Sequence, residues 1–81
     1  MLPTRRSPRQ VLLQQLLVAA RAAAGLSQRD VAKRLRQPQS FVSRYETGER
    51  RLDLIELIEV ATVLGCDLRK IVDDLIRFRQ R

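Results

Sequence analysis

Residues 27–48 read SQRDVAKRLRQPQSFVSRYETG and predict two short helices joined by a tight turn. Ser27 is a favourable N-cap, and Asp30 stands where its carboxylate can complete a capping box. Pro38 disfavours helical angles at the residue before it and lacks a backbone N–H, so it ends the first helix and fits the first turn of a second. We therefore expect helices at residues 28–35 and 38–47.

Three further helices flank this pair. Upstream, leucine and alanine recur at three- and four-residue intervals until Gly25, which favours a left-handed helix end. Downstream, Asp53 and Asp67 each repeat the N-cap signal in front of an apolar run. No segment alternates in the manner of a strand bounded by hairpin turns. The expected fold is all-α, with five helices at residues 10–24, 28–35, 38–47, 54–64 and 68–80.

The first nine residues differ from the rest of the chain. They contain Pro3 and Pro8, carry three arginines and show no apolar spacing. We interpret residues 1–9 as a flexible basic arm and residues 10–81 as one folded domain. With 81 residues, of which 44% are hydrophobic and 31% charged, the chain has room for one small soluble domain.

The composition argues against an enzyme. The chain has no histidine, which removes the commonest general base and the usual metal ligand. Its single cysteine, Cys66, excludes an internal disulfide and a thiolate zinc cluster, and it stands where a small packing residue is expected. We expect no metal and no cofactor, and the lack of a signal peptide predicts a cytoplasmic protein.

The charge is unevenly distributed along the chain. The formal net charge is +7, and residues 1–51 hold eleven Arg and Lys against three Asp and Glu, a balance of +8. Residues 52–81 have a balance of −1. A cationic surface of this kind attracts a polyanion, which is either nucleic acid or an anionic membrane.

The helix expected at residues 38–47 has two different faces. On a wheel of 100° per residue, Phe41, Val42 and Tyr45 point to one side. The other side carries amide, hydroxyl and guanidinium groups and no acid, which are the groups that read base edges in a major groove. These residues are Gln39, Ser40, Ser43, Arg44 and Thr47.

Two other polyanions are weaker candidates. Membrane binding needs large exposed apolar groups, yet the apolar faces are needed for the core and the chain has no tryptophan. RNA modules stack bases on exposed aromatic side chains, and two of the three aromatic residues point inward. Duplex DNA is therefore the favoured partner.

From Leu17 to Leu75 the chain resembles the phage-repressor and Cro-like helix-turn-helix proteins, the XRE family. The resemblance rests on the Ser27-Gln28 pair, on Ala32 at the helix crossing, and on two longer runs. The runs are residues 43–50 and 61–65, and the matching apolar anchors are Val31, Leu35, Val42 and Tyr45. The resemblance implies a compact five-helix lambda-repressor-like domain whose second and third helices bind DNA.

The turn departs from the family pattern at two positions. Arg36 stands where glycine is usual, and Pro38 stands where serine or threonine begins the recognition helix. A left-handed Arg36 costs about 1 kcal/mol. The alternative is a turn that starts one residue earlier, with Gln37 as an imperfect cap.

The resemblance also implies roles for individual residues. Gln39, Ser40, Ser43 and Arg44 would face base edges. Gln28 would contact phosphate and brace Gln39, and Arg21 and Glu46 would form a structural ion pair. Arginines flanking the helices suit phosphates because their forked guanidinium needs no particular base. These are Arg50 and Arg51, together with Arg5, Arg6 and Arg9 in the arm, for which a solvated tail is nearly as plausible.

The last expected helix suggests self-association. A domain of this size buries only about 60% of its unfolded surface, which makes an oligomer plausible. The apolar stripe of residues 68–80 extends beyond what a five-helix core needs, so Leu75, Ile76 and Phe78 are candidates for a dimer contact. Packing onto the first helix is the equal alternative.

These observations predict a sequence-specific double-stranded DNA-binding transcriptional regulator. We expect a homodimer that represses by covering a promoter, since 81 residues leave little surface for recruiting polymerase. An antitoxin that also binds a toxin and a controller of a restriction-modification system share the same chemistry. A pure protein-interaction module remains a rival, and it predicts no salt-dependent binding to duplex DNA.

Overall fold

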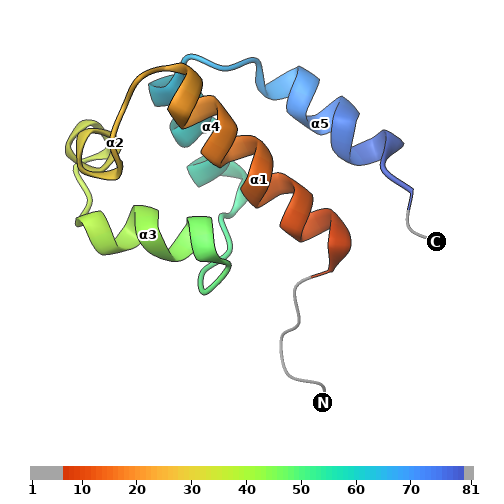
Figure 1. Cartoon of the computed structure of the whole chain (residues 1–81), viewed down its shortest axis with the longest axis horizontal. Coiled ribbons are helices and arrows are strands. Elements are labelled where there is room, and N and C mark those ends of the chain that lie inside the picture. Colours follow the sequence, from red (N-terminus) through yellow and green to blue (C-terminus); the bar gives the residue numbers. More distant parts are fainter. Residues whose placement is uncertain (1–6, 80–81) are drawn as a thin grey trace.

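A computed structural model describes residues 7–79 of the chain. Over this range it contains five helices and no strand, which confirms the all-α expectation. The helices are α1 (Pro8–Ala23), α2 (Gln28–Leu35), α3 (Gln39–Thr47), α4 (Leu54–Leu64) and α5 (Leu68–Arg77). In Figure 1, α2 and α3 lie together at one side, α1 crosses the middle in front of α4, and α5 lies on the side away from α3.

All five helices contribute to one core. Leu17, Val31, Val42 and Val60 are its largest fully buried side chains. The core cluster consists of Leu17, Val31, Ala32, Val42, Tyr45, Val60, Leu64 and Ile71. Because Val42 and Tyr45 anchor α3 in this core, the opposite side of α3 has to face solvent.

The ends of α1 and α5 differ from the expected ones. The Oγ atom of Ser7 accepts a hydrogen bond from the backbone N–H of Gln10, at 3.0 Å, so α1 starts at Pro8, a residue well suited to a first helical turn. Arg9 therefore belongs to α1 and not to the arm, whose other arginines, Arg5 and Arg6, lie outside the described residues. α5 ends at Arg77 because the next residue has an extended backbone.

The turn between α2 and α3 keeps the usual position despite its unusual residues. Arg36 is left-handed, with φ 58° and ψ 42°, and is the one non-glycine residue with positive φ among residues 7–79. The backbone N–H of Gln37 donates to Ala32, which closes the end of α2. The alternative with Gln37 as the cap is wrong, since Pro38 occupies the N-cap of α3 without a side-chain hydrogen bond.

No helix within the described range is both long enough and apolar enough to span a membrane.

Candidate nucleic-acid interface

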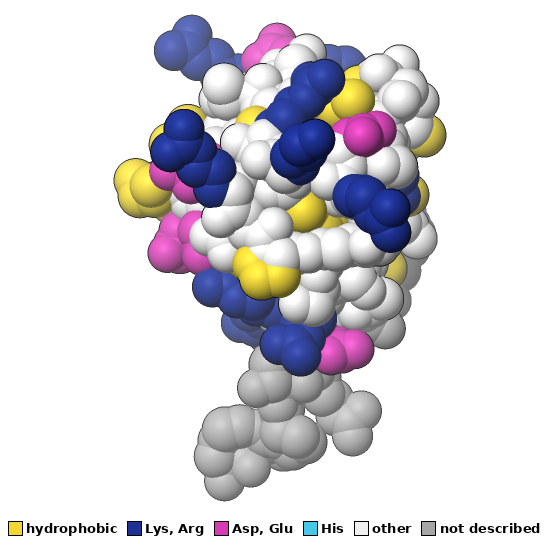
Figure 2. Space-filling model, turned by 90° about the vertical axis from the view of Figure 1, so that its left-hand side faces the viewer, with side chains coloured by type: hydrophobic (Ala, Val, Ile, Leu, Met, Phe, Trp, Pro, Cys, Tyr) yellow, Lys and Arg dark blue, Asp and Glu magenta, His cyan; other side chains and the backbone are white. Residues whose placement is uncertain are grey.

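The outward face of α3 carries the polar residues expected to read base edges. Gln39, Ser40 and Arg44 are exposed, and Ser43 is partly exposed. Figure 2 shows the side of the molecule formed by α2 and the start of α3, where Lys and Arg side chains are interspersed with uncharged groups and with several Asp and Glu side chains. The geometry therefore presents amide, hydroxyl and guanidinium groups on a cationic side of the domain.

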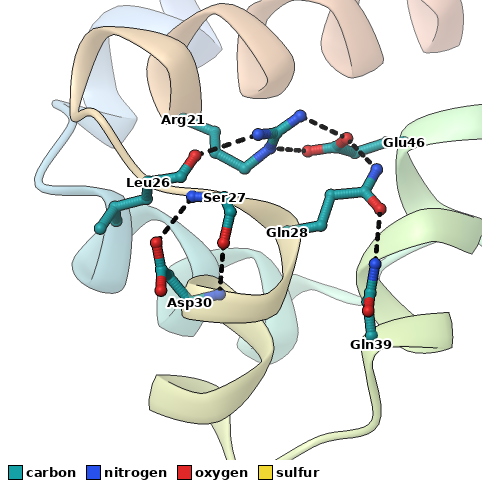
Figure 3. Close-up of polar contacts among 7 residues, drawn as sticks. All are labelled: Arg21, Leu26, Ser27, Gln28, Asp30, Gln39 and Glu46. Atoms are coloured by element: carbon teal, nitrogen blue, oxygen red, sulfur yellow. Dashed lines mark hydrogen bonds and ion pairs between the residues drawn. The ribbon is translucent and has the colours of Figure 1, made fainter.

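A chain of polar contacts links this face to the rest of the fold (Figure 3). Glu46 on α3 accepts from Arg21 on α1, with Nε to Oε2 at 2.7 Å and Nη2 to Oε1 at 3.1 Å. Glu46 Oε1 also accepts from Gln28 Nε2 at 2.8 Å. Gln28 Oε1 in turn accepts a longer contact, 3.5 Å, from Gln39 Nε2. One carboxylate thus joins the first three helices and reaches the start of α3.

The ion pair at the root of this chain is shielded from solvent. The side chain of Glu46 is 5% exposed and that of Arg21 is 19% exposed. The hydrogen bonds that Arg21 donates to Glu46 raise the pKa of Arg21, and Arg21 also donates to the carbonyl of Leu26 at 3.0 Å. The negative charge of Glu46 is therefore neutralised inside the protein, so Glu46 adds no uncompensated negative charge to α3.

The guanidinium of Arg50, expected to contact phosphate, is bound by other side chains of the protein. Its Nη1 and Nη2 atoms donate to both carboxylate oxygens of Glu56, at 3.0 and 2.8 Å. Its guanidinium also lies 4.8 Å from the centre of the Phe41 ring. Glu56 accepts from the backbone N–H of Asp53 as well, so Arg50 ties the end of α3 to the capping box of α4. A phosphate would have to share this guanidinium with Glu56.

A pH prediction follows from this pair. The hydrogen bonds from Arg50 and from the backbone of Asp53 lower the pKa of Glu56. Folded protein then binds fewer protons than unfolded protein near the pKa of a free glutamate, about 4.3, so this contribution is complete above that pH and disappears as pH falls through the lowered value. In urea denaturation, Glu56→Gln should show a smaller loss of stability on acidification than the parent protein. An equal loss in both proteins would contradict the pairing.

The other expected phosphate contacts differ in their surroundings. Arg51 is exposed within the loop that joins α3 to α4. Arg9 donates to the carbonyl of Phe78 at 3.2 Å. Arg44 lies 3.9 Å from Glu49, and both side chains are more than half exposed, so this pair leaves Arg44 available to a ligand.

The three candidates for a dimer contact are not equivalent. Leu75 packs against the core, Phe78 is half-buried, and Ile76 is 69% exposed. A different apolar surface, which was not predicted from the sequence, is formed by Leu54 and Ile55 at the start of α4 and by Ile58. The signal was present in the sequence, because every residue of α4 except Glu56, Thr62 and Glu59 is hydrophobic, which is more than one buried face needs.

Within residues 7–79, no group of histidine, cysteine and acidic side chains is arranged to hold a metal ion.

Comparisons with known proteins agree with this geometry. The sequence profile of the helix-turn-helix family matches residues 17–71, which run from the middle of α1 into α5. A solved structure of an XRE-family like protein from Pseudomonas syringae pv. tomato str. DC3000 is similar to the chain, with a TM-score of 0.80 and 44% identity. The similarity covers 84% of this chain and 83% of that chain. No curated protein sequence matches significantly.

Proposed function

Because the chain belongs to the XRE family of helix-turn-helix DNA-binding regulators, we propose that it is a repressor that binds a two-fold operator as a homodimer. The observation that carries the proposal is the outward face of α3, which is polar, free of acids and braced by Gln28 and Glu46. Such a face fits the major groove, where each base pair offers a distinct pattern of donors and acceptors.

Base reading is assigned to the outward side chains of α3. Arg44 offers the paired donors that guanine accepts at O6 and N7, and Gln39 offers the donor and acceptor that adenine matches. Ser40 and Ser43 supply hydroxyl groups that pair with either kind of partner. The core contacts of Val42 and Tyr45 hold these four side chains on one rigid helix.

Phosphate binding is assigned to groups around this face. Gln28 stands at the start of α2, where backbone N–H groups and the helix dipole favour an anion. Arg51 is exposed shortly after α3, and Arg50 and Arg9 would share their guanidinium groups between a phosphate and the protein. Arg5 and Arg6 belong to the same proposal as part of the basic arm.

Two related roles use the same interface. An antitoxin would also carry a surface for its toxin, and a controller of a restriction-modification system would bind DNA next to the genes it controls. The neighbouring genes distinguish these roles from a repressor of other promoters. A pure protein-interaction module does not need the cationic side of the domain.

Substitutions on α3 test the reading role. Arg44→Ala and Gln39→Ala should each cost about 1 to 3 kcal/mol of binding free energy on the selected operator and relax the preference at one position per half-site. Arg51→Ala should instead weaken specific and scrambled duplexes alike. Fluorescence anisotropy on operator, singly substituted operators and scrambled DNA measures all three variants.

A matched control is Arg69→Ala, which removes the same charge from an exposed position on α5. It should leave both affinity and base preference nearly unchanged. If Arg44→Ala weakens every duplex equally while Arg51→Ala changes the base preference, α3 is aimed differently and the assignment of reading residues is wrong.

A further inference from the structure

The outer face of α4 carries three of the five large hydrophobic side chains that are exposed among the described residues. Leu54 is 65% exposed, Ile55 is 62% exposed and Ile58 is 42% exposed. At 100° per residue, these three positions and Thr62 fall within one arc of about 100°. The hydroxyl of Thr62 donates to the carbonyl of Ile58 at 2.8 Å, so it is satisfied by the helix itself.

The opposite face of α4 is already used by the fold. Val60 and Leu64 on that face are buried in the interior. Of the two acids on α4, Glu56 is bound by Arg50, and Glu59 is the one charged residue among the exposed positions of the helix. A helix that is apolar on both sides is normally covered on both sides.

We propose that the outer face of α4 forms the homodimer contact, by packing against the same face of a second copy of this chain. A two-fold interface brings one patch against itself, which an apolar patch satisfies without any complementary partner elsewhere. Residues 1–51 carry a net charge of +8 and repel their counterparts, whereas residues 52–81, which include α4, carry −1. Contact through α4 therefore avoids the strongest repulsion between two copies.

The position of the patch along the chain suits binding to an operator. Thr47 ends α3 and Leu54 begins α4, so the segment that joins them, residues 48–53, spans at most about 25 Å. Recognition helices in a two-fold complex lie about 34 Å apart, which requires each to be centred about 17 Å from the axis. An axis next to the first turn of α4 is within that reach.

The competing surface on α5 is less suitable. Leu75 packs against the core, which leaves Ile76 and Val72 as its exposed aliphatic residues. The hollow beside Ile76 is also lined by Arg9 and Arg79. A two-fold contact there would bring like charges together, which opposes association.

The proposed α4 contact is small, and its size determines how strongly the homodimer is expected to associate. Three aliphatic side chains and their neighbours cover less than the roughly 800 Å² per partner of a standard stable interface. We therefore expect a weak dimer in free solution, with a dissociation constant in the range of about 10 µM to 1 mM. Two adjacent half-sites on DNA should strengthen it by holding the copies together.

A pair of isoleucine substitutions tests the proposal. Ile55→Asn should raise the dimer dissociation constant more than tenfold, because it places an unsatisfied amide in an apolar contact. Ile76→Asn is the matched control, with the same change at a similarly exposed position on α5, and it should leave the constant unchanged. Sedimentation equilibrium measures association up to about 1 mM, and circular dichroism confirms that both variants keep their helices.

The results that overturn the proposal are distinct. The α4 contact is contradicted if the parent protein stays monomeric over the whole concentration range. It is also contradicted if Ile55→Asn leaves the dimer dissociation constant unchanged. If Ile76→Asn weakens the dimer and Ile55→Asn does not, the dimer contact lies on α5. Neither result bears on DNA binding.

A second measurement rests on the proposed function. On duplex DNA with two half-sites, Ile55→Asn should abolish cooperative binding while keeping the affinity for a single half-site, since asparagine adds no charge near the phosphates. Cooperativity that survives the substitution contradicts the α4 contact. Absence of all specific binding in the parent protein would instead contradict the proposed function, so the two failures are distinguishable.

Discussion

Raising the salt concentration from about 50 to about 200 mM should lower the affinity for operator DNA by roughly 10³- to 10⁵-fold. The physical reason is counterion release, because each phosphate neutralised by Arg or Lys frees a bound cation from the duplex. A dimer with a balance of +8 in residues 1–51 of each copy has enough cationic groups for about 6 to 10 such contacts.

The slope of affinity against salt can be assigned to particular residues. Fluorescence anisotropy at several salt concentrations gives the slope for the parent protein and for two variants. Arg51→Ala should make the slope shallower by about one for each phosphate that is no longer neutralised, and Arg69→Ala on α5 should leave it unchanged. An affinity for duplex DNA that does not change with salt concentration would instead favour a protein-interaction module.

Glu46→Ala should lower the free energy of unfolding by about 2 to 4 kcal/mol. The substitution leaves Arg21, whose side chain is 19% exposed, without its carboxylate partner. It also removes the acceptor for the amide of Gln28. The expected cost stays below the largest values seen for buried pairs because Arg21 keeps some contact with water and its bond to the carbonyl of Leu26.

The control for this prediction lies three residues further along the chain. Glu49→Ala removes the same charge from a side chain that is 69% exposed and 3.9 Å from Arg44, so the expected change is within about 0.5 kcal/mol. Urea denaturation followed by circular dichroism measures both variants. Similar effects of the two substitutions would mean that the Arg21 and Glu46 pair does not support the fold.

The bounds of α2 and α4 were predicted to the residue, whereas α3 begins one residue later than expected because Pro38 is its N-cap. α2 is bounded by the capping box of Ser27 and by Pro38, and α4 by the capping box of Asp53 and by Gly65. α1 and α5 were not, because each has one weakly marked end. At the start of α1, Pro8 is compatible with both an arm and a first helical turn, and the Ser7 cap decides between them.

The candidate site likewise contains features that were predictable from the sequence and features that were not. The outward residues of α3 follow from helical periodicity, which is a local property of the sequence. The partner of Arg50 does not, because Glu56 lies beyond a loop and its capping role was the more obvious one. The exposed face of α4 was also missed, since an apolar helix alone does not tell which of its sides the rest of the chain covers.

The contacts that run from Glu46 to Gln39 also have a direction. A carboxylate can only accept, so the amide of Gln28 has to turn its nitrogen toward Glu46 and its oxygen toward Gln39. Gln39 then uses one of its two N–H groups on Gln28 and keeps one N–H and its oxygen for an outside partner. The Glu46 carboxylate thereby favours one orientation of the Gln39 amide, and in the proposed DNA complex that orientation sets which atoms of the amide face a base.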